Sequence, residues 1–205
     1  AIHSVAENLT KMQKDGKEST EQLAFEILEK QWDTSSYRNQ RTKENQDKAK
    51  SKDMVQTYME WEKNNPNTPV DVESKFRIKI NDVTISGMID RVEKTPEGEY
   101  EVIDFKTGYA YKNKNTIKED VQMNIYALGT KKLYGKLPKK TSLFYIKDNK
   151  LVPHFIEKET LDEFTKSLGD KIDNIFDEKF DAAPEFRKCS RCDYASICDA
   201  KEEVS

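Results

Sequence analysis

Residues 87–108 read GMIDRVEKTPEGEYEVIDFKTG, and this stretch decides the fold prediction. Two apolar runs, 88–92 and 100–105, flank the polar turn 95–99, a pattern typical of a β-hairpin with a Gly-containing loop. Side chains alternate along a strand, so Asp104 and Lys106 point to the same face. The hairpin can bring Asp90 beside them. Two carboxylates and an ammonium at one point favour a divalent metal held by the acids, with the lysine beside an attacking water.

Further motifs accompany this hairpin. Gly87 stands before the Ile-Asp-Arg run, Asp-Phe-Lys is followed by Thr-Gly, and 122–126 read Gln-x-x-x-Tyr. The cysteines follow the spacing Cys189-x2-Cys192-x5-Cys198. With these motifs, from His3 to Cys198, the chain resembles the PD-(D/E)xK nuclease superfamily, and within it the RecB/AddB-like nucleases of the iron–sulfur type. The resemblance implies an α/β fold with a mixed central β-sheet flanked by helices, a restriction-endonuclease-like core, a helical insertion and a Cys-rich C-terminal tail.

The resemblance also implies a metal site. Asp90 and Asp104 would ligate Mg²⁺ or Mn²⁺, and the backbone carbonyl of Phe105 would add a ligand, since these hard cations prefer oxygen. Lys106 would stabilise the developing charge or orient the water nucleophile. The alternative is that both acids are surface turn residues paired with lysines, but their apolar neighbours are core-like.

Four other positions belong to the predicted site by resemblance. His3, in the pattern Ile-His-x-Val-x-x-x-Leu, would add a metal ligand, although a lone His near a helix start is more often structural or exposed. Glu73 would be a further acid or a partner for Lys106, or else a solvated strand residue. Gln122 and Tyr126 share one helix face and would border the metal and touch the nucleic-acid backbone, with a half-buried helix tyrosine as the alternative. His154 matches no motif, and we expect it to be structural.

The cysteines suggest a metal or cluster site. Three cysteines are one short of a four-cysteine set. The resemblance implies a [4Fe–4S] cluster on Cys189, Cys192 and Cys198, with its fourth cysteine upstream of the histidine helix. The chain begins Ala-Ile-His without Met, so we expect a piece cut from a larger protein, in which the cluster is incomplete or absent. Zinc with a non-cysteine fourth ligand is the alternative, and a disulfide is the least favoured.

Composition and charge limit the class of protein to which this chain can belong. The chain has 205 residues, 36% charged and 35% hydrophobic, with no apolar run long enough for a membrane span and no signal peptide, so we expect a cytoplasmic protein. A net charge of −3 is mild evidence against DNA binding. Local charge can outweigh the total, and lysines gather just after the proposed site. These are Lys112, Lys114, Lys118, Lys131, Lys132, Lys136, Lys139 and Lys140.

Periodicity predicts the other elements. Helices are expected over 2–14, from Thr20 to Trp32, over 38–64 as an exposed helix docked by its C-terminal half, over 118–134 and over 160–180. In 118–134 we expect Val121, Ile125, Leu128 and Leu133 to be buried. A strand is expected over 70–80 and a hairpin over 141–146 and 151–156. We expect a nuclease core over 1–185, with an insertion over about 17–66, and a Cys-rich tail over 186–205.

The combined expectation is a metal-dependent DNA nuclease. Relatives of this branch imply an exonuclease on single-stranded DNA ends, joined to a helicase motor in DNA repair or recombination. One alternative is an inactive nucleic-acid-binding module of a helicase complex, against which the intact Asp90, Asp104, Lys106 and Gln122 argue. The other is a CRISPR-associated spacer-processing nuclease.

Overall fold

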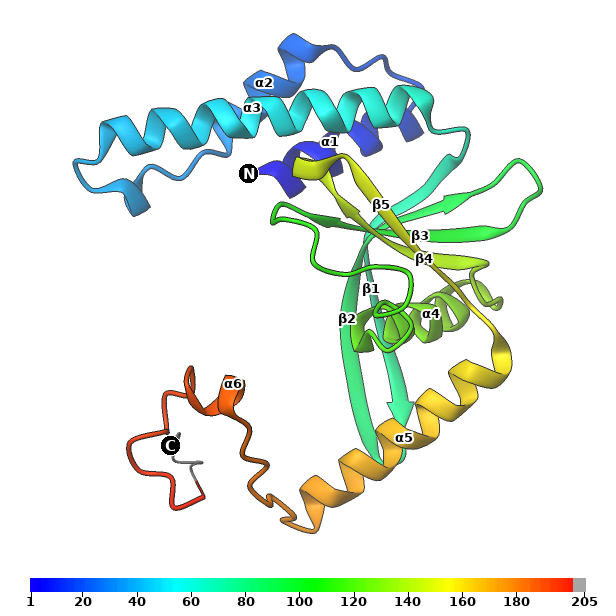
Figure 1. Ribbon diagram of the computed structural model, residues 1–205. Coiled ribbons are helices and arrows are strands. Elements are labelled where there is room, and N and C mark those ends of the chain that lie inside the picture. The colour runs from blue at the N-terminus through cyan, green and yellow to red at the C-terminus, as the bar shows by residue number, and fades with distance from the viewer. Residues whose placement is uncertain (201–205) are drawn as a thin grey trace. The chain divides into compact units, whose positions relative to one another are not determined.

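The computed structural model describes residues 1–200 and arranges helices around a five-stranded sheet (Figure 1). The helices are α1 (Ile2–Lys14), α2 (Glu21–Lys30), α3 (Arg41–Asn64), α4 (Val121–Tyr134), α5 (Lys158–Phe176) and α6 (Phe186–Cys189), with 3₁₀ turns at Ser35–Tyr37 and Ile146–Asp148. The strands are β1 (Thr68–Ile80), β2 (Val83–Lys94), β3 (Tyr100–Lys106), β4 (Lys140–Tyr145) and β5 (Lys150–Phe155). The predicted class, a mixed sheet flanked by helices, is confirmed.

The strands follow the order β1-β2-β3-β4-β5, and β3 with β4 is the parallel pair. Helix α4 makes the crossover that a parallel pair requires. The other pairs are antiparallel. Strand β2 begins at Val83, earlier than expected, so β1 and β2 form a long hairpin of their own, with Asn81 in the turn at φ 51°.

Strand β3 separates two apolar cores. Ile103 and Phe105 pack with α1, α2 and α3, whereas Val102 packs with α4. A strand buried on both faces carries adjacent apolar residues, as Val102 and Ile103 do in the run 100–105. Asp104 lies within this run, and its side chain is only 3% exposed.

The buried face of α4 differs from the prediction. Val121 and Leu133 are 47% and 41% exposed. The buried residues are Met123, Asn124, Tyr126, Ala127, Gly129 and Thr130. A Cβ on Gly129 would lie 2.7 Å from Cγ of Phe76, so the helix approaches β1 too closely for larger side chains there. The prediction placed the largest aliphatic residues inside and missed this close approach.

A buried arginine ties the N-terminal helices to the sheet. The fully buried Arg91 of β2 donates to both carboxylate oxygens of Glu62 in α3, at 2.6 and 2.8 Å, and to the hydroxyl of Thr10 in α1 at 2.9 Å. Its Nε lies 2.6 Å from Glu93. A bidentate, desolvated pair of this kind is strongly destabilising to break, because it leaves a charge buried without its partner.

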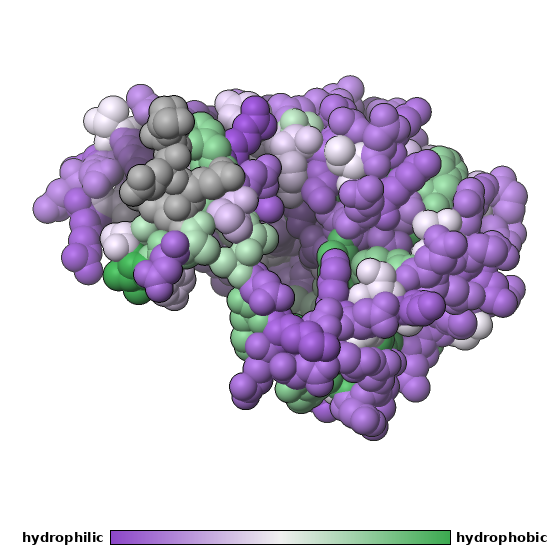
Figure 2. Space-filling view, turned by 60° about the horizontal axis from the view of Figure 1, so that its bottom comes forward, coloured by the Kyte–Doolittle hydropathy of each residue, from purple (hydrophilic) through white to green (hydrophobic). Residues whose placement is uncertain are grey.

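Residues Ala1–Phe164 form one compact unit, and a second unit begins at Thr165. The second unit holds the C-terminal part of α5, the short helix α6 and the free thiols of Cys189, Cys192 and Cys198. The face drawn in Figure 2 is mostly hydrophilic. Across residues 1–200, no helix combines the length and apolar character needed to cross a membrane.

Candidate active site

The site forms where β2 and β3 part. Their ladder runs from Lys94–Tyr100 to Arg91–Ile103 and goes no further. Beyond this last pair, the Asp90 carboxylate bonds to β3 in place of the backbone, because its Oδ2 accepts the backbone N–H of Phe105 at 2.9 Å. A side chain thus replaces a strand-to-strand hydrogen bond, and the carboxylate of β2 lies against the end of β3.

Lys106, Asp104 and α4 form one polar network. Nζ of Lys106 lies 2.7 Å from Oδ2 of Asp104 and donates to Oε1 of Gln122 at 3.0 Å. The Gln122 amide donates to Oδ1 of Asp104 at 3.0 Å and to the hydroxyl of Tyr126 at 2.8 Å. Lysine can only donate, so the amide oxygen must face it and the amide nitrogen must face the carboxylate. The structure therefore brings together Asp104, Lys106, Gln122 and Tyr126.

His3 reaches the same strand end from α1. Its Nε2 lies 2.7 Å from the carbonyl oxygen of Phe105, which is within hydrogen-bond distance. The side chain belongs to an exposed residue at the start of the helix, while Ile2 beside it is buried in the α1 core. The two residues that resemblance assigned as extra ligands are thus adjacent.

Glu73 faces Asp90 across the first hairpin. Val72 pairs with Arg91 and Ser74 with Ile89, which leaves Glu73 opposite Asp90. Glu73 has φ 51°, in the left-handed region, a conformation that costs a non-glycine residue on the order of 1 kcal/mol. Its charge contributes to the raised pKa of Asp90. Glu73 therefore belongs to the acidic surroundings of the site.

Burial makes these carboxylates hard to ionise. Burial first, and then the neighbouring Asp104, raise the pKa of Asp90 to about 6. Burial also raises the pKa of Asp104, although Lys106 opposes this. Burial lowers the pKa of Lys106, but the Asp104 carboxylate outweighs it and the net shift is upward. A buried carboxyl whose pKa is raised by a neighbouring carboxylate marks a place where a cation is favoured.

The donor chemistry fits a hard divalent cation. Two carboxylates, a backbone carbonyl and an imidazole are available, and Mg²⁺ and Mn²⁺ bind oxygen ligands with occasional imidazole. The buried Oδ2 of Asp104 receives no aligned hydrogen bond within residues 1–200. In the same range, no three His, Cys, Asp or Glu side chains are already gathered in metal-binding geometry. The residues that would hold such a cation are Asp90, Asp104, the Phe105 carbonyl and His3.

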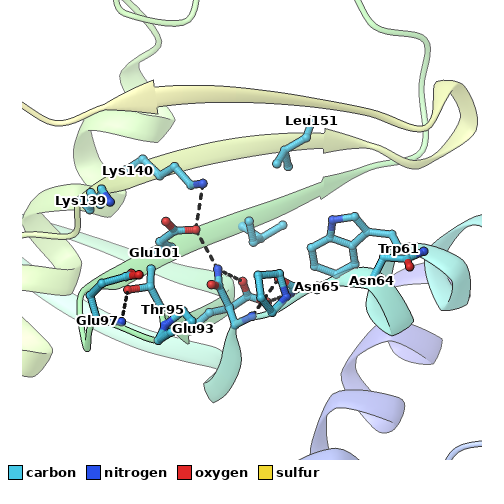
Figure 3. A pocket seen from close by; sticks show the side chains of 14 residues that line it. Trp61, Asn64, Asn65, Glu93, Thr95, Glu97, Glu101, Lys139, Lys140 and Leu151 are labelled. Carbon is cyan, nitrogen blue, oxygen red and sulfur yellow. Dashed lines mark hydrogen bonds and ion pairs between the residues drawn. The ribbon is translucent and has the colours of Figure 1, made fainter.

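A second concave site, of about 410 Å³, lies on another part of the sheet (Figure 3). Its acids already have partners: Asn65 and Asn67 donate to Glu93, and Asn67 and Lys140 bind Glu101. Satisfied carboxylates of this kind stabilise the fold. Lys112 is likewise paired, with Asp120 at 2.6 Å, so two of the lysines grouped after the site form ion pairs within the protein.

Two features of the first unit were not anticipated. Arg91 was noted only as part of a motif, yet it is the largest fully buried side chain. The signal was an arginine inside an apolar strand run. Tyr109 and Tyr111, just after Lys106, are 68% and 74% exposed. By contrast His154 is buried beside Asn124, burial lowers its pKa, and it lies outside the site as expected.

Comparison with known proteins identifies the family of this chain. The profile of the PD-(D/E)XK nuclease superfamily matches residues 1–199. The Gene 69 protein of Mycobacterium phage D29 is 29% identical over 133 residues, 62% of this chain and 47% of that protein. The Gene 69 protein of Mycobacterium phage L5 is 28% identical over 133 residues, 62% of this chain and 43% of that protein. The chain thus spans about half the length of these curated relatives.

Among solved structures, the crystal structure of SSO0001 matches with a TM-score of 0.39 and 20% identity. The match covers 65% of this chain and 62% of that one. A likeness of this size carries no argument about the site.

Proposed function

Since the chain belongs to the PD-(D/E)XK nuclease superfamily, we propose that it is a deoxyribonuclease domain that hydrolyses phosphodiester bonds with Mg²⁺ or Mn²⁺. The observation that carries this proposal is the meeting of Asp90, Asp104 and Lys106 where β2 and β3 part. Asp90, Asp104, the Phe105 carbonyl and His3 would hold the metal. When bound, the metal supplies Lewis-acid activation of water and of the scissile phosphate.

The remaining residues orient this chemistry. Lys106 places a positive charge beside Asp104, where negative charge develops on the phosphoryl oxygens. Gln122 fixes both Lys106 and Asp104 through its amide, and Tyr126 fixes Gln122 in turn. Such support holds reacting groups within the small tolerance that catalysis needs.

We further propose single-stranded DNA ends as the substrate. Tyr109 and Tyr111 are exposed immediately after Lys106, and Lys147 lies 3.6 Å from the centre of the Tyr109 ring. Exposed aromatic rings with adjacent cations are suited to stack unpaired bases, which a duplex does not offer. Work beside a helicase motor in DNA repair or recombination rests on the motif resemblance alone.

For the tail, we propose a [4Fe–4S] cluster that uses Cys189, Cys192 and Cys198. The support is the donor chemistry: three free thiols at the spacing of cluster proteins. A turn bond from Cys192 N to the Cys189 carbonyl at 3.3 Å brings the first two backbones together. The fourth ligand must come from another residue. Iron and sulfide analysis of the full-length protein, purified without oxygen, tests this, and zinc in their place would reject it.

The nuclease proposal is tested by Asp104→Asn in the full-length protein. Asparagine keeps an oxygen for Gln122 but loses the charge, so Mn²⁺-dependent cleavage should fall by several orders of magnitude. An exposed acid on α3, changed as Asp53→Asn, is the matched control. Normal cleavage by the folded Asp104→Asn protein would reject this site. A parent protein that binds DNA and never cleaves it would instead identify an inactive binding module.

A further inference from the structure

Between positions 75 and 79, one face of the long hairpin of β1 and β2 carries three cations and no acid. Lys75, Arg77 and Lys79 alternate along β1 and are all exposed. Alternate residues of a strand share a face, so the three lie on one side of the ribbon. The residues paired with them across the hairpin are the neutral Met88, Ser86 and Thr84.

Like many other cations of the described chain, the row takes no part in its ion pairs. Acids outnumber bases, 38 to 35, and some exposed lysines elsewhere form ion pairs, such as Lys14 with Asp71 at 3.3 Å. Within residues 1–200, none of Lys75, Arg77 and Lys79 forms one. Three neighbouring cations repel each other mildly, so an acid-free arrangement favours an anionic partner from outside.

The opposite face of the hairpin explains why the row of three cations is regular. Phe76 and Ile80 are buried and Ile78 is half-buried, so every second residue is held inward. The Phe76 ring lies so close to Gly87 that a Cβ there would meet it at 2.5 Å. Packing fixes the register of the hairpin, and the three cations therefore stay on one face of it.

The spacing of the row suits a nucleic-acid backbone. Alternate strand residues recur about every 6.6 Å, the same order as the distance between successive phosphates of an extended strand. A groove of about 520 Å³ runs over this part of the ribbon. It is lined by Lys75, Phe76, Arg77, Ser86, Gly87 and Met88.

The ribbon also leads to the candidate active site. Glu73 precedes Lys75 by two residues, and Asp90 follows Met88 by two. At about 3.3 Å per residue, the row begins roughly 7 Å and ends roughly 20 Å from Asp90 along the strands. Figure 1 shows β1 and β2 extending well past the part of β2 that pairs with β3.

We infer that Lys75, Arg77 and Lys79 form a track for the phosphates of the nucleic-acid strand that enters the site. This inference rests on the proposed nuclease function and adds a binding surface outside the metal site. The proposed contacts are to backbone charge, which every sequence presents, so binding to the track should not depend on base sequence. The track holds about three phosphates beyond the scissile one.

Binding and cleavage are measured separately to test it. Affinity for a fluorescent single-stranded DNA is followed against salt concentration in EDTA, in the Asp104→Asn background. The variant replaces Lys75, Arg77 and Lys79 by Gln. The matched control replaces Lys30, Arg41 and Lys43, two lysines and an arginine that are exposed on or beside α2 and α3. Cleavage is then measured with both triple changes in the Asp104 parent.

Losing three contacts should reduce the slope of log K against log salt by about 2, at roughly 0.7 per phosphate. The control should keep the parent slope. Ser86→Glu, a single change opposite Arg77, should also weaken binding and serves if the triple variant misfolds. An unchanged slope in the triple variant, in a parent that binds and cleaves DNA, overturns the track and leaves the nuclease proposal standing.

Two other outcomes are informative. A parent that neither binds nor cleaves DNA would reject the proposed function and the track together. Equal, track-dependent binding to phosphatidylserine vesicles, with no binding to DNA, would overturn the track as a nucleic-acid surface and make it a lipid contact.

Discussion

Asp90→Asn should stabilise the metal-free protein while abolishing cleavage. Burial, and then the Asp104 charge, raise the pKa of Asp90 from 3.8 to about 6, so the carboxylate is disfavoured in the folded state. Asparagine removes that charge and keeps an oxygen for the Phe105 N–H. The residue that catalysis needs is therefore one that the empty fold tolerates poorly.

The magnitude follows from the pKa shift. One pKa unit corresponds to about 1.4 kcal/mol, so a change from 3.8 to about 6 sets an upper limit of about 3 kcal/mol. Asp90 is only half-buried, and solvent screening reduces the expected gain to about 1–2 kcal/mol. For a chain of 205 residues this corresponds to a Tm increase of roughly 2–8 °C.

The sign of the pH dependence is fixed. A carboxyl whose folded pKa is raised binds its proton more tightly in the folded state, so its stability contribution is full at low pH. It is lost as pH rises through about 6. The advantage of Asp90→Asn should therefore grow between about pH 4 and pH 6 and stay constant above pH 7.

Thermal unfolding in EDTA between pH 5 and pH 8, followed by circular dichroism, measures this gain. Asp53→Asn, which removes a charge from the exposed face of α3, should show no such profile. Mn²⁺ at 100 times its Kd should stabilise the parent by about 2.7 kcal/mol, and Asp90→Asn far less, reversing their order. A variant less stable than the parent at pH 8, or a gain independent of pH, would refute the reasoning.

Three further predictions follow from particular contacts. Lys106→Gln should lower kcat by about two to three orders of magnitude, with little change in DNA affinity in EDTA; normal single-turnover rates would exclude its proposed role. Gly129→Ala should lower the free energy of unfolding by about 1–3 kcal/mol in urea titrations, whereas Gly108→Ala, whose Cβ meets nothing within 4 Å, should not; equal effects would contradict the close approach. Replacing Tyr109 and Tyr111 by Ala should weaken single-stranded DNA binding by about 1–3 kcal/mol per lost stack and leave duplex binding unchanged, and equal losses on both would reject stacking.

Much of the fold could be predicted because it depends on local sequence patterns. The 88–92 and 100–105 runs with their Gly-containing turn predicted the hairpin, and α1 extends over Ile2–Lys14 as its apolar stripe predicts. The buried face of α4 could not be predicted from the sequence, because it depends on how close Gly129 comes to Phe76 of β1. Tertiary distance decides such a face, and periodicity in one helix contains no information about it.

The candidate site likewise combines features that the sequence predicts with features that it does not. Strand alternation predicts that Asp104 and Lys106 share a face, and the structure places them 2.7 Å apart. The left-handed conformation of Glu73 has no sequence signal, since the residue is neither Gly nor Asn and lies within a regular strand pattern. It arises where the sheet opens, and the opening is a property of two strands together.

That opening connects the fold to the chemistry. A continuous β2–β3 ladder would satisfy the Phe105 N–H with a backbone carbonyl and leave Asp90 free to rotate. Ending the ladder at Arg91–Ile103 makes the Asp90 carboxylate the required acceptor, so its position is set by the backbone of the strand that carries Asp104 and Lys106. The next residue, Arg91, is held by Glu62 and Glu93, and this anchors β2 on the opposite side. Asp90 is thus constrained by a hydrogen bond of its own and by a buried neighbour, which allows two mutually repelling carboxylates to be held ready for a cation.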